Sequence, residues 1–213
     1  MSILQNYLNI KNEAEILNSN INIVVVTKGQ HFVNIKPIID QGHLDFGENR
    51  VQEALLKWSE YIRINSNINL HLIGKLQSNK AKDAIKIFNF IHSLDNEKLA
   101  ITLASLEVIN NRKINYFIQV NIGTEKHKSG IDVASVNEFV NYCSFDLKLN
   151  ILGLMCIPPL NIDSSEYFLN LKSLNDNLKL KNLSIGMSND FKVAIQCGSS
   201  HIRIGSAIFK SSN

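Results

Sequence analysis

Residues 22–27 read NIVVVT, and residues 151–157 read ILGLMCI. Both stretches are nearly unbroken apolar runs, whereas a strand with one face in water would alternate apolar and polar residues. Strands with such runs are typical of parallel sheets, because helices cover the sheet and neither face of the strand lies in water. The two stretches therefore predict buried strands of an α/β protein.

Runs of this kind recur along the chain at Asn22–Thr27, Leu44–Gly47, Asn69–Gly74, Phe90–Leu94, Ile114–Asn121, Asn150–Ile157, Asn182–Gly186 and Ile202–Gly205. Between the runs, apolar residues such as Val51, Leu55 and Trp58 recur at the three- and four-residue steps of a helix face. The same spacing precedes the first run, over Ile3–Leu17. Eight strand–helix repeats predict a closed (β/α)8 TIM barrel with an extra N-terminal helix.

The helices that follow three of the runs have plausible N-caps in Asn49, Ser78 and Asp95. An open doubly wound sheet is the alternative fold, but it usually carries a glycine-rich turn after its first strand. Residues 27–31 read TKGQH and lack that turn, and no Pro-, Gly- or Ser-rich linker divides the chain. We therefore expect residues 1–213 to form a single barrel domain.

Composition argues against several classes of protein. Apolar residues make up 45% of the chain and charged residues 19%, which argues against intrinsic disorder. The net charge of +3 is a weaker basic excess than nucleic-acid-binding domains usually carry. Three widely spaced cysteines favour a reducing compartment, and no apolar run is long enough to span a bilayer. The six histidines lack metal-ligand spacing. We expect a cytoplasmic protein without a metal, nucleic-acid or membrane partner.

Barrel enzymes place their functional residues where the strands end. Lys28 directly follows the first predicted strand. A lysine at such a mouth can lose its proton through burial or a neighbouring cation, and the neutral amine can form a Schiff base with an aldehyde. A lysine at the end of a strand is also commonly a solvated loop residue. Position alone leaves both interpretations of Lys28 open.

The loops after the last two predicted strands read GMSND at residues 186–190 and GSA at 205–207. This pair of loops often holds a phosphate in barrels of this class. Gly186 and Gly205 would allow close approach of an anion, and Ser188 and Ser206 would add hydroxyl donors. Each loop alone is also compatible with an ordinary strand–helix turn. Together they predict a phosphate site.

Arg203 lies between Ile202 and Ile204 in the last predicted strand, so alternation points its side chain toward the barrel interior. A buried arginine needs an acceptor, which could be a carboxylate such as Glu48 or a ring nitrogen of a bound ligand. A lysine, a phosphate cradle and a central arginine together suit pyridoxal 5′-phosphate. Because arginine keeps its proton, such a ring would stay uncharged, which disfavours reactions that need a long-lived carbanion.

Ordered motifs spread over nearly the whole chain carry a family resemblance; they include VVVTKGQ, FGENRVQEAL, HLIGKLQSNKAK, HSLDNEKLA, QVNIGTEKHKSGID, ILGLMCIP and LSIGMSND with IRIGSAIFK. The set resembles the pyridoxal phosphate homeostasis proteins, single-barrel relatives of the N-terminal domain of alanine racemase. The resemblance implies a (β/α)8 barrel that holds pyridoxal phosphate, the active form of vitamin B6, as an internal Schiff base. It implies a role in intracellular supply of the cofactor, and no established turnover.

Residue by residue, the resemblance implies a Schiff base at Lys28, phosphate contacts from Ser188, Gly205 and Ser206, a pyridine-nitrogen contact from Arg203, and a cofactor mouth lined by Asn49, Asn121 and Met155. The chain departs from the family at residues 29–31, where Gly-Gln-His replaces the usual Thr-Lys-Pro and removes a second lysine. Residues 126–128, Lys-His-Lys, form a basic loop that we expect to be exposed.

Two enzymatic alternatives remain open. An amino-acid racemase needs a second acid/base, which alanine racemase takes from a tyrosine of another domain. The tyrosines here fall on predicted helices or at a strand start, so we expect at most weak racemisation; they are Tyr7, Tyr61, Tyr116, Tyr142 and Tyr167. A Schiff-base aldolase acting on a sugar phosphate would leave Arg203 without a role. We expect a monomer, with pyridoxal-phosphate-dependent enzymes as recipients if the cofactor is handed on.

Overall fold

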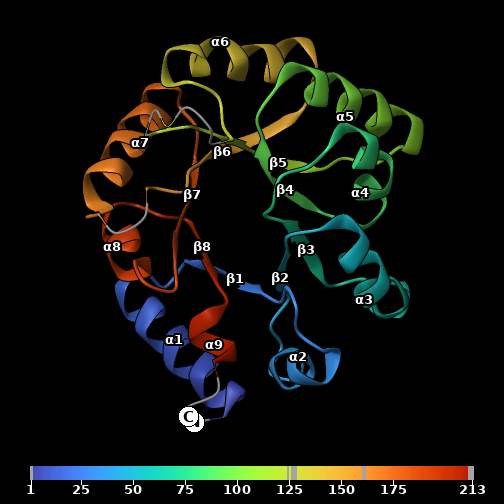
Figure 1. The fold of residues 1–213 in the computed structure, drawn as a ribbon, viewed down its shortest axis with the longest axis vertical. Helices are drawn as coiled ribbons and strands as arrows, with labels where there is room; N and C mark the ends of the chain where they lie inside the picture. Colours follow the sequence, from blue (N-terminus) through green and yellow to red (C-terminus); the bar gives the residue numbers. More distant parts are fainter. Residues whose placement is uncertain (1, 124, 126–128, 160–161, 211–213) are drawn as a thin grey trace.

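The structure, a computed structural model, describes residues 2–123, 125, 129–159 and 162–210. Its strands are β1 (Asn22–Val26), β2 (Asp45–Glu48), β3 (Asn69–Leu72), β4 (Phe90–Leu94), β5 (Asn115–Gln119), β6 (Asn150–Met155), β7 (Asn182–Met187) and β8 (His201–Ile204). They close into a parallel barrel in which each strand pairs with the next and β8 pairs with β1 (Figure 1). The predicted (β/α)8 barrel is confirmed, and every strand end falls within two residues of its prediction.

Helices surround the strands (Figure 1). They are α1 (Ile3–Leu17), α2 (Phe32–Ile39), α3 (Val51–Ile64), α4 (Ala81–Ile87), α5 (Glu97–Asn110), α6 (Val136–Asn141), α7 (Ser165–Asn177), α8 (Phe191–Gln196) and α9 (Ser206–Phe209), with short helical turns at Ser78–Lys80, Val133–Ser135 and Tyr142–Asp146. The extra helix α1 packs against α2, α8 and α9, beside the seam where β1 meets β8. None of the helices in the described ranges is both long and apolar enough to cross a membrane.

The three predicted N-caps are wrong. Helix α3 is preceded by Arg50 in the cap position rather than Asn49. Ser78 begins a short 3-10 turn that runs into α4, so it does not cap that helix. The cap of α5 is Asn96, one residue after the predicted Asp95, and its side-chain oxygen accepts the N–H of Leu99 at 2.9 Å. Asn96 and Asp95 are both good cap residues, so the sequence could not choose between them.

The hydrophobic core lies between the strands and the outer helices, whereas polar side chains occupy much of the barrel interior. His92 on β4 and Ser184 on β7 are hydrogen-bonded at 2.8 Å although their strands are not neighbours, so their contact crosses the interior. His71 and His201 lie with them, and all three histidines are buried. Burial lowers the pKa of His71, lowers that of His92 well below its ordinary value, and lowers that of His201 to about 3.

These histidines predict that the barrel is destabilised by mild acid. The unfolded chain takes up imidazole protons below about pH 6.5, whereas the folded barrel keeps these rings neutral. The free energy of unfolding should therefore fall as pH drops from 6.5, by up to about 1.4 kcal/mol per pH unit for each such histidine. Denaturant unfolding at several pH values would measure the slope.

The variant His201→Phe should reduce that slope by the contribution of one proton, up to about 1.4 kcal/mol per pH unit, because phenylalanine cannot titrate. Phenylalanine suits the position since His201 packs among aromatic rings. Ser199→Ala is the matched control. It removes a buried hydroxyl that donates to the Ile185 carbonyl at 2.8 Å, so it should lower stability and leave the slope unchanged. Equal slopes in His201→Phe and the parent chain would contradict the prediction.

Candidate functional site

A cavity of about 930 Å³ opens at the carboxyl-terminal ends of the strands. It brings together seven of the eight site residues expected from the sequence, namely Lys28, Asn49, Asn121, Ser188, Arg203, Gly205 and Ser206. The eighth, Met155, is fully buried at the end of β6 and does not line the cavity. Ile157 and Pro158, from the loop that follows β6, line it instead.

Lys28 follows β1 and lies in the cavity with its side chain exposed, so the burial considered from the sequence is not observed. Helix α3 holds the peptide groups on both sides of it. Lys57 Nζ donates to the Thr27 carbonyl at 2.6 Å, and the Gly29 N–H donates to Glu53 Oε1 at 2.5 Å. Lys57 and Glu53 also pair with each other at 3.1 Å. We call Glu53 and Lys57 the α3 clamp; they fix the backbone that carries the Lys28 amine.

The α3 clamp is anchored on a buried carboxylate. Glu48 Oε1 accepts hydrogen bonds from Thr27 Oγ1 at 2.6 Å, Lys57 Nζ at 2.9 Å and Trp58 Nε1 at 3.0 Å. Burial alone would raise the pKa of Glu53, but bonds from the Gly29 N–H and Lys57 outweigh it and lower that pKa. The sequence analysis missed this cluster, although Glu53 and Lys57 stand four residues apart on one helix, the usual spacing of a helical ion pair.

Arg203 lines the cavity from β8 and is only 4% exposed. Its partners are the carbonyl and hydroxyl oxygens of Ser184, both 2.7 Å from Nη1, and the Cys156 carbonyl, 3.1 Å from Nη2. Glu48 is paired with Lys57, so within the described residues it is not the acceptor considered for Arg203. A guanidinium has five N–H groups, and three contacts leave at least two of them for a ligand.

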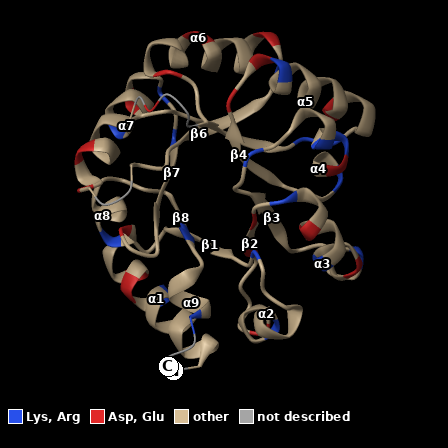
Figure 2. Ribbon diagram, in the orientation of Figure 1, with Lys and Arg blue, Asp and Glu red and all other residues tan. Residues whose placement is uncertain are grey.

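Buried charge is rare in this barrel. Most charged residues belong to the outer helices and loops (Figure 2). Within the described part of the chain, the buried carboxylates and guanidiniums are those of Glu48, Glu107 and Arg203. Glu107 accepts from Lys113 and from Tyr116 on the outer side of the sheet. Arg203 is thus the buried cation that faces the cavity.

The loops after β7 and β8 meet beside Arg203, as expected for a phosphate cradle. The Ala207 N–H donates to Ser188 Oγ at 3.2 Å and joins the two loops. Gly205 and Ser206 line the cavity, but Gly186 does not. Gly186 has a φ of +94°, and a Cβ there would lie 2.5 Å from the Cβ of Ala194, so this glycine serves the packing of α8. The expected role of Gly186 at the anion is not observed.

Backbone contacts also fix the other side of the cavity. A Cβ on Gly74 would lie 2.3 Å from the Asn49 carbonyl oxygen, so the glycine allows the β3 loop to hold Asn49. Asn121 uses its side chain to close its own loop, donating to the Glu125 carbonyl at 3.0 Å and accepting the Glu125 N–H at 3.2 Å. Lys75 is exposed and lines the cavity. The basic loop at residues 126–128 lies outside the described residues.

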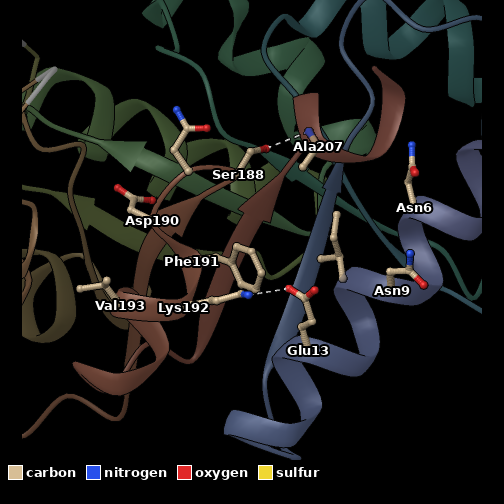
Figure 3. A pocket seen from close by; sticks show the side chains of 11 residues that line it. Asn6, Asn9, Glu13, Ser188, Asp190, Phe191, Lys192, Val193 and Ala207 are labelled. Atoms are coloured by element: carbon tan, nitrogen blue, oxygen red, sulfur yellow. Dashed lines mark hydrogen bonds and ion pairs between the residues drawn. The ribbon is translucent and has the colours of Figure 1, made fainter. Parts of the chain in front are cut away.

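A second hollow of about 560 Å³ adjoins the predicted phosphate cradle, between α1 and the start of α8 (Figure 3). Four residues line both this hollow and the larger cavity, namely Ser188, Asn189, Asp190 and Val193. An ion pair between Lys192 and Glu13, 3.0 Å long, crosses it from α8 to α1 (Figure 3). The extra helix therefore supports the cradle from outside the barrel.

Comparisons with known proteins agree with this geometry. The family model for the alanine racemase N-terminal domain matches residues 2–213. Pyridoxal phosphate homeostasis proteins are similar along most of the chain. The one from Aquifex aeolicus is 38% identical, with 77% of this chain and 75% of that protein covered. The one from Escherichia coli is 34% identical, covering 89% and 85%. This chain belongs to the pyridoxal phosphate homeostasis protein family.

Solved structures of this family have the same fold. PipY from Synechococcus elongatus, solved without pyridoxal phosphate, is 30% identical and superposes with a TM-score of 0.91 over 98% of this chain and all of PipY. A second PipY structure has pyridoxal phosphate bound and superposes with a TM-score of 0.89. Alanine racemase from Clostridium difficile, 16% identical with a TM-score of 0.70, shares the barrel fold.

The tyrosines lie where the sequence analysis placed them. All five are among the described residues, and none of them lines the cavity. Tyr7 and Tyr61 belong to α1 and α3, and Tyr116 is buried on β5. A tyrosine of this chain therefore does not stand opposite Lys28 as the second acid/base of a racemase.

The α3 clamp predicts a large and specific loss of stability in Lys57→Met. This variant keeps the length of the side chain but leaves the Glu48 carboxylate buried without its cation, which should cost about 3–5 kcal/mol of unfolding free energy. In the double variant Glu48→Gln/Lys57→Met the loss should be clearly smaller, because the buried charge is gone. Denaturant unfolding measures both.

Lys36→Met is the matched control, since Lys36 forms an exposed ion pair with Asp40. This change should have little effect on stability. A loss in Lys57→Met no greater than in Lys36→Met would show that the α3 clamp does not stabilise the β1 loop.

Proposed function

We propose that this chain binds pyridoxal 5′-phosphate as a Schiff base on Lys28 and serves the intracellular homeostasis of that cofactor. One observation carries the proposal: an amine, a buried guanidinium and two serine-containing loops open into the same cavity. These groups match the aldehyde, the ring nitrogen and the phosphate of one molecule. Pyridoxal phosphate homeostasis proteins from other organisms, and PipY with pyridoxal phosphate bound, support it.

The residues fit such a ligand. Arg203 keeps at least two N–H groups beyond its three contacts with Ser184 and Cys156. Ser188 Oγ accepts the Ala207 N–H and still has its own proton to donate. A Cβ on Gly205 would approach the Cβ of Val26 to 3.1 Å, so the glycine lets the β8 turn lie against the end of β1, close to Lys28. The donor set is cationic or neutral where an anion would lie.

Pyridoxal phosphate, when bound, supplies an aldehyde and a ring that withdraws electrons. Lys28 would bond to the aldehyde carbon through its neutral nitrogen, and the carbonyl oxygen would leave as water. Arg203 would donate a hydrogen bond to the ring nitrogen and keep its own proton. Ser188, Gly205 and Ser206 would bind the phosphate through hydroxyl and amide donors. The α3 clamp would hold the β1 loop in place around the amine.

The open mouth supports a carrier role in addition to simple retention. Lys28 is exposed in the cavity, so water and incoming amines can reach the carbon it would bind. Release of the cofactor to pyridoxal-phosphate-dependent enzymes would use this access. The three cysteines are free and buried, which suits the reducing cytoplasm that we propose as its location. A monomer remains the predicted state.

The decisive experiment is borohydride reduction of the protein mixed with pyridoxal phosphate, followed by peptide mass spectrometry. The reduced adduct should be found on Lys28. Lys28→Ala should lose both the adduct and the visible absorbance, while retaining weak binding through Arg203 and the phosphate loops. Lys75→Ala is the matched control, because it removes another exposed lysine from the same cavity and should keep the adduct. An adduct on Lys75, or none, would refute the assignment.

The phosphate cradle predicts the effect of Ser188→Ala. Loss of one hydrogen bond to a charged phosphate should weaken pyridoxal phosphate binding by about 1–3 kcal/mol, measured by equilibrium titration of the absorbance. Ser164→Ala, which removes a cavity-lining serine from the loop after β6, should leave the affinity unchanged. Parent-like affinity in Ser188→Ala would mean that the phosphate binds elsewhere.

A further inference from the structure

A continuous line of hydrogen bonds runs through the barrel interior beneath Arg203. Arg203 Nη1 on β8 lies 2.7 Å from Ser184 Oγ on β7. Ser184 Oγ lies 2.8 Å from His92 Nδ1 on β4, and His92 Nε2 lies 2.9 Å from His71 Nδ1 on β3. His71 Nε2 lies 3.0 Å from Asp45 Oδ1 at the start of β2. We call these five residues the interior chain.

The Asp45 end gives the interior chain one direction. An ionised carboxylate only accepts, so His71 Nε2 must carry the proton that it donates. A neutral His71 then has a bare Nδ1, which accepts from His92 Nε2. A neutral His92 in turn has a bare Nδ1, which accepts the hydroxyl proton of Ser184. Each residue thus donates toward Asp45.

The Arg203 end independently requires the same direction. A guanidinium can only donate, so Ser184 Oγ accepts from Arg203. The hydroxyl has one proton of its own, and His92 Nδ1 lies 2.8 Å away to accept it. The two charged ends therefore agree, and every link has one donor and one acceptor. Such aligned chains polarise one another and are stronger together than separately.

The surroundings keep both imidazoles neutral. Burial lowers the pKa of His71 and outweighs the opposing effect of Asp45. Burial lowers the pKa of His92, and the nearby His71, His201 and Arg203 lower it further. The rings of Phe90 and Phe117 pack on His71 and His92 with centroids 4.2 and 4.5 Å apart. Burial would raise the pKa of Asp45, but His71, His43 and Asn69 together outweigh it and lower that pKa.

We propose that Ser184, His92, His71 and Asp45 are positioning residues for Arg203, which fix its guanidinium under the ligand and relay to it the opposite charge of Asp45. The proposal rests on the proposed function, because it takes Arg203 as the contact of the pyridine ring. A barrel interior filled by aliphatic residues would need no such chain. A polar chain is stable only when every member is satisfied, as it is here. The interior chain connects the ligand cavity to the opposite end of the barrel.

The direction of the interior chain can be tested without the cofactor. In the cofactor-free protein labelled with ¹⁵N-histidine, NMR should find His71 and His92 neutral at pH 7.5, each with its proton on Nε2 and a bare Nδ1. A proton on Nδ1 of either ring, or a charged ring at that pH, would overturn the proposal. Because this measurement uses the parent chain, it does not depend on whether a variant folds.

The positioning role is tested on the bound cofactor. Ser184→Ala cuts the link between Arg203 and His92, and Asp45→Asn keeps an acceptor for His71 but removes the charge. Both should shift the visible spectrum of the bound pyridoxal phosphate and its pH profile, and Ser184→Ala should weaken binding about tenfold. Ser199→Ala removes a buried hydroxyl outside the interior chain and should change neither spectrum nor affinity.

The outcomes separate the two proposals. If the parent chain forms the Lys28 adduct while Ser184→Ala and Asp45→Asn keep its spectrum, pH profile and affinity, the positioning role is wrong and the proposed function stands. If Ser199→Ala shifts the spectrum as much as Ser184→Ala does, the effect is a general loss of packing and the positioning role is again wrong. If the parent chain forms no adduct, the proposed function fails, and with it the role of Arg203 as a ring contact.

Discussion

The pairing of β1 with β8 is the constraint on which the rest of the structure depends. It sets Val24 beside Arg203 and Val25 beside Ile204, and so closes the sheet. Closure places the loop after the first strand, with Lys28, next to the loop after the last, with Gly205 and Ser206. Chain segments at the two ends of the sequence therefore form one wall of the cavity. An open sheet would leave these segments at its separate edges.

Closure also buries polar and charged groups on both sides of the sheet. The barrel satisfies these groups in two different ways. Outside the sheet, Glu48 is neutralised at short range by Lys57, and that ion pair steadies the β1 loop. Inside, the hydrogen-bond partners of Arg203 in the described part of the chain are neutral carbonyl and hydroxyl oxygens of Ser184 and Cys156. Direct pairing would occupy the N–H groups that a ligand needs. In the interior chain proposed above, the distant Asp45 compensates the charge of Arg203 through neutral groups, so these N–H groups stay free.

Much of the fold and the site was predictable because its signals are local. A buried parallel strand is recognisable from a run such as NIVVVT, and a loop such as GMSND carries its own turn chemistry. Interactions between distant segments could not be predicted. Gly186 looked like an anion-binding residue, yet its contact is with Ala194 of α8. Met155 is fully buried, and Ile157 and Pro158 of the following loop line the cavity instead. The lysine–glutamate pair of α3 was visible as a helical spacing, but nothing in the sequence said which loop it would hold.

Because one edge of β1 pairs with β2 and the other with β8, the last strand of the barrel, the order of synthesis matters. In a nascent chain Lys28 is made right after β1, whereas the loop with Gly205 and Ser206 is made only after all eight strands. Until then the lysine has no arginine or serine loop beside it, and the half-built sheet has two open edges. A polypeptide that ends before β8 therefore lacks one wall of the cavity, and we expect it to lack the proposed ligand site.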